Sequence, residues 1–188
     1  MGKIVLFVLL SISIQASFSQ QIKRDGLVKT YLTISPSIML DNSERPFYFH
    51  GNLEGYVSEQ VSIAGDGFFY LGTLNDLAIF QYNNSMFAGI NWHPDKKGSS
   101  DPYIGFQPGI AFTKLASSAS EVKNGVNPLV SVNLGYNYFI NHYFQFFVAG
   151  KLILGEHAVD RRQSLNALQF SAGLGFSLPT KKPIKQNL

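Results

Sequence analysis

The sequence contains no cysteine, which excludes disulfide bonds, thiolate metal sites, cysteine nucleophiles and a lipoprotein acyl anchor. Charged residues are scarce, at 14%, and the net charge of +3 is too small and too scattered to indicate a nucleic-acid partner. Beyond the amino terminus, no run approaches the roughly 20 apolar residues of a membrane helix. A Gly-rich phosphate loop and a metal-ligand cluster are also missing. We therefore expect neither metal nor other cofactor.

The most regular pattern lies between Val126 and Leu154. Apolar residues occupy every second position on both sides of the pair Asn141-His142, and strict period two around a two-residue break predicts a β-hairpin. Each arm has about a dozen residues, against about five or six in a soluble strand, and can cross a bilayer at a tilt. One face is apolar and the other is small and polar, which is typical of strands between lipid and a polar lumen.

The same alternation recurs along the chain and predicts eight strands, over residues 27–40, 47–57, 61–71, 79–92, 103–113, 126–140, 143–154 and 165–178. An even number returns both termini to one side of a membrane. The predicted fold is an all-β, eight-stranded antiparallel up-and-down transmembrane β-barrel. Gly65-Asp66-Gly67 could be a kink or a hairpin turn, and we favour the kink because the parity continues through it. Pro36, Pro108 and Pro128 fit less well, since each removes a ladder donor.

Charge placement separates this fold from a soluble barrel. A soluble barrel would show the same alternation with its apolar face inside and its polar face in water. The chain has 15 basic and 12 acidic residues, yet only Lys29, Glu54, Asp66 and Lys151 fall within the predicted strands, all on the polar face. A water-facing sheet would carry many more. These four residues and His50, four positions from Glu54 on the same face, are predicted to form a polar network in the lumen.

Aromatic residues support the same arrangement. An interfacial girdle is predicted near the periplasmic strand ends from Trp92, Tyr136, Tyr138, Phe144 and Phe176. Phe80 is expected to point outward and Gln81 inward. Other rings are expected to fill the narrow interior of an eight-stranded barrel and to leave little or no open pore: Tyr31, Tyr48, Tyr56, Phe68, Tyr70, Tyr103, Phe139, Tyr143 and Phe147.

The ends of the chain have their own patterns. Residues 1–19 combine Lys3, an apolar core and small residues, which indicates a secretory signal peptide with cleavage before Gln20. Residues 20–26 are predicted to be a polar periplasmic lead-in, residues 27–178 the barrel, and residues 179–188 a short basic periplasmic tail. Lys181, Lys182 and Lys185 in this tail could rest on anionic lipid head groups or on a periplasmic partner.

The phrases GNLEGYVSEQVSIAGDGFFYLG, YIGFQPGIAF and LGYNYFINHYFQFFVAGKLILG resemble the small outer-membrane β-barrel family. They especially resemble the porin-like barrel domains of Bacteroidota, which are OmpA/OmpX-like in size. The segment LQFSAGLGFSL is similar to the last strand that the barrel-assembly machinery recognises in this family. The resemblance implies an integral protein of a Gram-negative outer membrane. Its implied partners are phospholipid, lipopolysaccharide, the assembly machinery and other envelope proteins.

No catalytic residue is assigned, and the function we expect is a structural or accessory one, in which the barrel could be a subunit of an envelope complex. A narrow channel for a small or apolar solute is the first alternative. A lipid-A-modifying enzyme is the second, and would need a Ser–His–acid set such as His157, Ser164 and Asp160. We favour a solvated charged loop there. His93 and His142 are placed in turns with no specific role.

Overall fold

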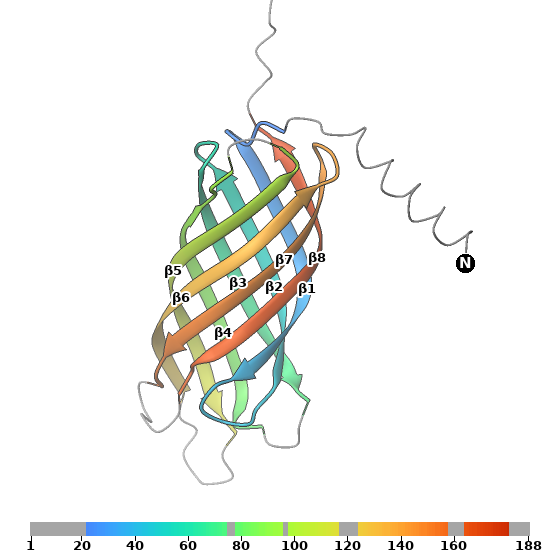
Figure 1. Ribbon diagram of the computed structural model, residues 1–188. Coiled ribbons are helices and arrows are strands. Elements are labelled where there is room, and N and C mark those ends of the chain that lie inside the picture. The colour runs from blue at the N-terminus through green and yellow to red at the C-terminus, as the bar shows by residue number, and fades with distance from the viewer. Residues whose placement is uncertain (1–21, 75–77, 96–97, 117–123, 158–163, 181–188) are drawn as a thin grey trace, which may run out of the picture.

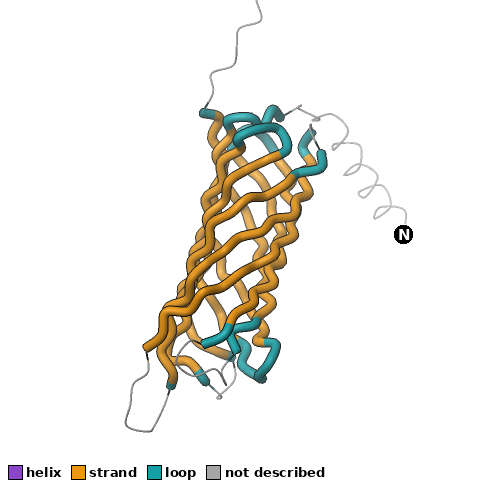
Figure 2. The backbone as a smooth tube through the Cα atoms, turned by 90° about the vertical axis from the view of Figure 1, so that its left-hand side faces the viewer, coloured by secondary structure: helices purple, strands orange, loops and turns teal. Residues whose placement is uncertain are grey.

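The computed structural model describes residues 22–74, 78–95, 98–116, 124–157 and 164–180. Its eight strands form a closed antiparallel barrel in which each strand pairs with its neighbours in sequence and the first pairs with the last (Figures 1 and 2). The strands are β1 (Leu27–Met39), β2 (Pro46–Tyr56), β3 (Val61–Thr73), β4 (Phe80–Trp92), β5 (Ser100–Leu115), β6 (Asn124–Phe139), β7 (Phe144–Gly155) and β8 (Ala167–Pro179). The predicted fold class is confirmed.

The alternation in sequence becomes an inside and an outside because side chains on a strand point to opposite faces in turn. Large apolar residues from every strand are exposed on the outer wall, for example Leu32, Phe106 and Leu134 at 58 to 67%. Their neighbours in sequence are buried in the interior, mostly as polar residues. None of the described residues belongs to a helix long and apolar enough to cross a membrane.

Strand β3 runs without a break through Gly65-Asp66-Gly67. The glycines face Leu53 and Gly51 across the ladder with β2, and the register does not change there. The prediction of one continuous strand is therefore confirmed, and the hairpin-turn alternative is wrong.

Three sequence-based orientations are wrong. A register shift between Phe80 and Tyr82 inverts the parity at the start of β4, as a β-bulge does. Phe80 is 1% exposed in the interior, and Gln81 points outward. Tyr143, expected inside, precedes β7 and is 52% exposed.

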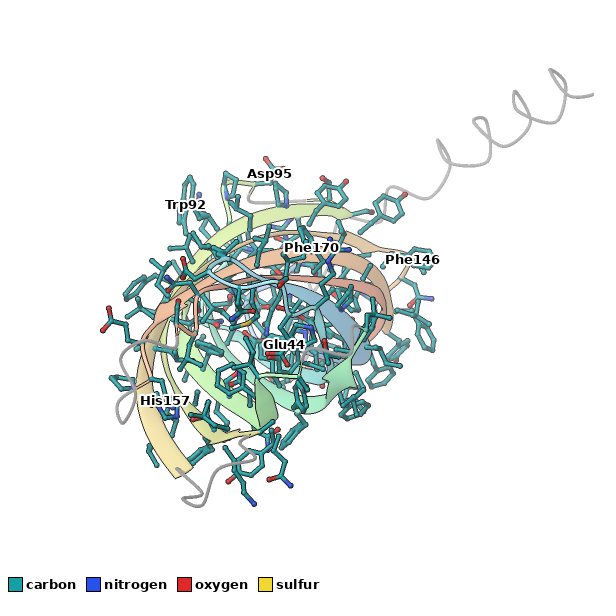
Figure 3. The ribbon with its side chains drawn as sticks, turned by 90° about the horizontal axis from the view of Figure 1, so that it is seen from below. Glu44, Trp92, Asp95, Phe146, His157 and Phe170 are labelled. Atoms are coloured by element: carbon teal, nitrogen blue, oxygen red, sulfur yellow. The ribbon has the colours of Figure 1, made fainter. Side chains whose placement is uncertain are left out.

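The interior has two chemically different halves. We call the end where β1 begins and β8 ends the terminal end, at the top of Figure 1, and the opposite end the far end. In the far half, apolar side chains pack together, among them Tyr48 and Phe68, which were expected inside; this apolar core consists of Met39, Tyr48, Phe68, Phe80, Phe87, Ala111, Leu129, Ile153, Leu165 and Ala167. Viewed from the far end, Glu44 lies within the ring of strands, whereas Trp92 and Phe146 lie outside it (Figure 3).

Candidate functional site: the charged barrel interior

Five ionisable side chains meet inside the terminal end and are called the mouth cluster: Arg24, Lys29, Glu54, His93 and Asp101. Asp101 Oδ1 lies 3.1 Å from Arg24 Nη1 and 2.7 Å from His93 Nδ1. Glu54 lies 2.9 Å from Lys29 Nζ and 3.2 Å from His93 Nε2. His93 therefore joins two carboxylates, each of which also contacts a basic side chain. Buried charges are tolerated when they are paired in this way.

The lead-in before β1 closes the terminal end. Arg24 is 0% exposed, and its guanidinium donates to the backbone carbonyls of Asp95 and Ser100. Its backbone N–H donates to Glu59 at 3.0 Å. Ile22, 1% exposed, packs in a small apolar cluster with Leu27, Tyr56 and Phe139. Ile22 and Arg24 of the predicted polar lead-in are thus buried, because the Asp101 carboxylate of β5 and an apolar lining are available to them at the mouth.

His93 was assigned no role from sequence, and this is also wrong. It follows β4 directly, and its ring is 0% exposed between Tyr56 and Tyr103. Burial is the largest single influence and acts to lower the pKa of His93, but the hydrogen bonds and negative charges of Asp101 and Glu54 together outweigh it and raise the pKa above its ordinary value. Two carboxylates, one at each ring nitrogen, favour an imidazolium.

A second group, the mid-barrel cluster, lies deeper and contains His50, Asp66, Gln107, Lys151 and Ser171. Asp66 lies 2.9 Å from His50 Nε2 and 2.7 Å from Lys151 Nζ. Lys151 also donates to Gln107 and stands over the rings of Phe68 and Phe87 at 5.5 and 4.6 Å. Asp66 on β3 and Lys151 on β7 come from opposite sides of the closed barrel. Their ion pair therefore links the two sides across the interior.

The structure places all five residues of the sequence-predicted lumen network inside the barrel, but in two groups. Lys29 and Glu54 belong to the mouth cluster, and His50, Asp66 and Lys151 to the mid-barrel cluster. The expected neighbour of His50 was Glu54, four residues away on β2. Its actual partner is Asp66, on the adjacent β3, because the ladder places Asp66 opposite Asn52 and within reach of the imidazole.

Sequence reasoning missed Arg24, His93 and Asp101. Asp101 lies before the strand predicted over residues 103–113, but β5 begins at Ser100 and carries it into the interior. Arg24 and His93 lie outside the strands, where no alternation exists to orient them. The one available signal was their position: all three are charged or ionisable residues that flank predicted strands at the same end of the barrel.

Both clusters contain a Ser–His–Asp chain of contacts. In the mouth cluster, Ser62 Oγ lies 2.9 Å from His93 Nε2, and the other ring nitrogen faces Asp101. A catalytic serine must pass its proton to histidine, but the Ser62 hydroxyl donates to Glu54 at 2.5 Å. Ser62 is also 0% exposed, out of reach of a substrate.

In the mid-barrel cluster, Ser171 Oγ lies 2.8 Å from His50 Nδ1, and Asp66 accepts at the other ring nitrogen. Ser171 is 6% exposed and His50 2%. The Ser171 hydroxyl also lies 2.5 Å from the Ser35 hydroxyl. Both Ser–His–Asp chains therefore read as hydrogen-bonded supports of the barrel interior.

The described residues of the candidate loop triad, His157 and Ser164, show no such Ser–His contact. His157 is 0% exposed rather than part of a solvated loop, and it lies close to Gly125 of β6, where an added Cβ would meet its ring at 3.0 Å. Ser164 pairs with Glu156 in an isolated bridge. Asp160 lies outside the described residues. Within the described residues, no group of three or more His, Asp or Glu side chains could hold a metal ion.

The five girdle residues all lie on the outer wall near the terminal end. Exposed fractions are 51% for Trp92, 40% for Tyr136, 38% for Tyr138, 43% for Phe144 and 39% for Phe176. Phe144 and Phe176 face each other across β7 and β8, with ring centroids 5.8 Å apart. All five are therefore aromatic side chains of the outer wall at this end of the barrel.

The interior between the two clusters is nearly filled. A cavity of about 10 Å³ remains, lined by Tyr31, Asn52, Asn133 and Lys151 among others, which is room for about one water molecule. Asn52 Oδ1 and Asn133 Oδ1 are buried without a protein partner, so a water molecule would satisfy both. This packing does not support a channel for larger solutes.

Several solved structures share this fold, among them the following three. The N-terminal β-barrel domain of Pseudomonas aeruginosa OprF is 13% identical, with a TM-score of 0.54, covering 85% of this chain and 100% of that domain. Neisserial surface protein A is 12% identical with a TM-score of 0.61, covering 81% and 96%. Ail, the attachment invasion locus protein of Yersinia pestis, is 10% identical with a TM-score of 0.57, covering 82% and 99%. No protein-family model matches the chain, and no curated protein matches it by sequence.

Proposed function

We propose that this chain is an integral outer-membrane β-barrel protein with a non-enzymatic, structural or accessory role. The observation that carries the proposal is the inverted distribution of polarity. Apolar side chains such as Leu53, Met86 and Phe146 are 55 to 60% exposed, while Lys29 is paired with Glu54, and Lys151 with Asp66, inside the barrel. In water this surface would aggregate, whereas in a bilayer it is the favourable arrangement.

The aromatic girdle supports a definite depth in that bilayer. Trp and Tyr are favoured where lipid head groups meet acyl chains, and the girdle would mark this level at the terminal end. The terminal end would then face the periplasm, since it carries the short connections between β2 and β3 and between β6 and β7, and periplasmic turns of such barrels are short. The far end, with the longer connections, would face the outside.

Trp92 is the only tryptophan of the chain, so its fluorescence tests the proposal directly. In vesicles of brominated phospholipid, we expect bromine close to the head groups to quench Trp92 more strongly than bromine close to the chain ends. The matched control moves the single tryptophan to the middle of β6, in the double variant Trp92→Phe, Val132→Trp, and should reverse this order.

Cell fractionation supplies the second measurement. The protein should remain in the membrane pellet after alkaline carbonate extraction and should sediment with the outer membrane on a density gradient. Release by carbonate together with unquenched Trp92 would contradict the proposal.

The proposed partners are the outer-membrane lipids, both phospholipid and lipopolysaccharide, the barrel-assembly machinery during insertion, and envelope proteins in a larger complex. We also propose that the protein is related to the porin-like barrel domains of Bacteroidota, which its sequence resembles. Purification from native membranes in mild detergent, followed by mass spectrometry, tests the accessory role. A stoichiometric set of envelope proteins would support it, and a barrel recovered alone would count against it.

A further inference from the structure

The seam between β1 and β8 has the longest interior break among the ladders of the described strands. Backbone pairing joins Leu27–Thr30 to Phe176–Pro179 and Ser37–Met39 to Ala167–Gln169. Between these two stretches, residues 31–36 and 170–175 are all described but form no backbone pairs. The register is the same on both sides of the break, so no bulge accounts for it. Within β4 and β5, by contrast, pairing lapses at only two positions, Ala88 and Gly89.

The sequence supplies a reason for the break. Leu40 N donates to Asn166 O, and Thr180 N donates to Gly26 O. Since alternate residues of a strand pair with the same neighbour, the even-numbered residues of β1 face β8. Pro36 is one of them, and the donor that it lacks therefore belongs to this seam. In addition, the Thr33 hydroxyl donates to Ala172 O at 2.9 Å, an oxygen that would otherwise accept from the N–H opposite it.

Side chains on the inner face are accessible at the break. Thr33 and Gly173 have interior parity, yet Thr33 is half-buried and Gly173 is exposed. Directly behind them, the rings of Tyr31 and Phe147 stack with centroids 3.8 Å apart, and a Cβ on Gly173 would meet Phe147 at 3.2 Å. The break is thus a notch in the wall with an aromatic floor.

An apolar groove of about 340 Å³ on the outer wall leads to this notch. Its sides come from Leu32, Phe144, Leu174 and Phe176, and Tyr31 and Gly175 of the inner face form its base. A second outer groove, of about 510 Å³, extends from Val28 of β1 across β2 and β3 to Ala88 of β4, and the ladders that join these strands have no interior break. The two grooves have similar linings and differ in whether the wall beneath them is closed.

We propose that the β1–β8 notch is a lateral binding site for an acyl chain of a membrane lipid, which enters between the strands and rests on Tyr31 and Phe147. The site rests on the proposed membrane location. An acyl chain suits it because the groove walls are apolar and the surrounding medium would be lipid. Entry separates no ladder pairs over the six positions of the break, whereas elsewhere in the wall it would break paired backbone groups, which is costly in lipid.

The test uses the full chain in vesicles that contain a phospholipid with a photoactivatable diazirine in its acyl chain, with adducts mapped by mass spectrometry. We expect adducts at outward residues such as Leu32 and, in addition, at the inward residues Thr33 and Gly173. Ala64, an inward residue that lines the second groove, is the internal control and should carry none.

A disulfide staple supplies the matched variant, since the chain has no cysteine of its own. Ile34 and Ala172 face each other in the common register of the seam, so Ile34→Cys with Ala172→Cys can bridge the notch. The oxidised form should lose the adducts at Thr33 and Gly173, and the reduced form should keep them.

The outcomes separate the two proposals. Adducts at outward residues alone, or equal adducts at Thr33 and Ala64, would overturn the notch and leave the membrane location intact. If no outward residue carries an adduct, the barrel does not lie in the bilayer, and both proposals fail.

Discussion

The two halves of the barrel interior solve the same packing problem in different ways. At the terminal end, Arg24, Lys29, Glu54, His93 and Asp101 form ion pairs and hydrogen bonds. The far half contains the apolar core, with a few buried polar side chains such as Glu44 and His157 beside it. Buried charges are costly unless every partner is present, whereas an apolar core loses stability in proportion to the volume removed. The comparison teaches that the terminal half depends on particular residues and the far half on total volume.

The largest effect is expected from Asp101→Asn. Asp101 accepts hydrogen bonds from Tyr56, His93 and Asn137 and pairs with Arg24, so the variant leaves buried positive charge unpaired. Such losses cost about 3–5 kcal/mol. Urea unfolding in lipid vesicles measures the change. The exposed Asp95→Asn is the control and should be neutral; equal effects of the two variants would show that the mouth cluster is not stabilising.

Next in size is Leu129→Ala in the apolar core. Leu129 is 5% exposed and covers Gly155, whose added Cβ would lie 2.4 Å from Leu129 Cδ2. Removing a buried leucine costs about 2–5 kcal/mol, and the volume-conserving Leu129→Met should cost less than about 1.5 kcal/mol. For each variant, the loss in the free energy of unfolding should not change with pH. If the loss of free energy of unfolding in these variants depended strongly on pH, it would contradict the proposed difference between the two halves.

These halves also differ in how far sequence could foresee them. Period-two alternation identified all eight strands and the faces of most residues, because a strand fixes the direction of each side chain. It failed at Phe80, where a bulge inserts a residue that no composition signal marks. It also failed at Arg24 and His93, which lie beyond the strands and are drawn inward by Asp101. Which carboxylate a buried cation selects depends on ladder register, and one sequence does not give that register.

Arg24→Ala is expected to have a smaller effect, because the lead-in lies at the end of the barrel and water can enter once it is released. Hydrogen bonds to a charged group contribute about 1.5–3 kcal/mol, and Arg24 makes several, to Asp95 O, Ser100 O and Asp101. Amide hydrogen exchange should rise at residues 22–26. Lys23→Ala removes an exposed neighbour and should leave exchange unchanged. If exchange rises equally in both variants, the closure does not depend on the guanidinium.

The smallest effect concerns pH and His93. Its pKa in the folded protein lies above the ordinary value of 6.5, so folding favours the imidazolium. The stabilisation is complete below pH 6.5 and is lost as the pH rises through the raised folded pKa. In His93→Gln, the free energy of unfolding should therefore lose part of its decline between neutral and alkaline pH.

A second group acts in the same direction and has to be separated from His93. Burial raises the pKa of Glu44 against the hydrogen bond from Tyr70, so stability linked to Glu44 also falls as its carboxyl ionises. Its decline begins lower, near the ordinary glutamate value of 4.5, and the group lies at the far end. Glu44→Gln should remove the acidic part of the decline, and His93→Gln the part above neutrality. If His93→Gln leaves the alkaline part unchanged, the imidazolium does not hold the two carboxylates together, and the terminal half would depend on Arg24 and Lys29 alone.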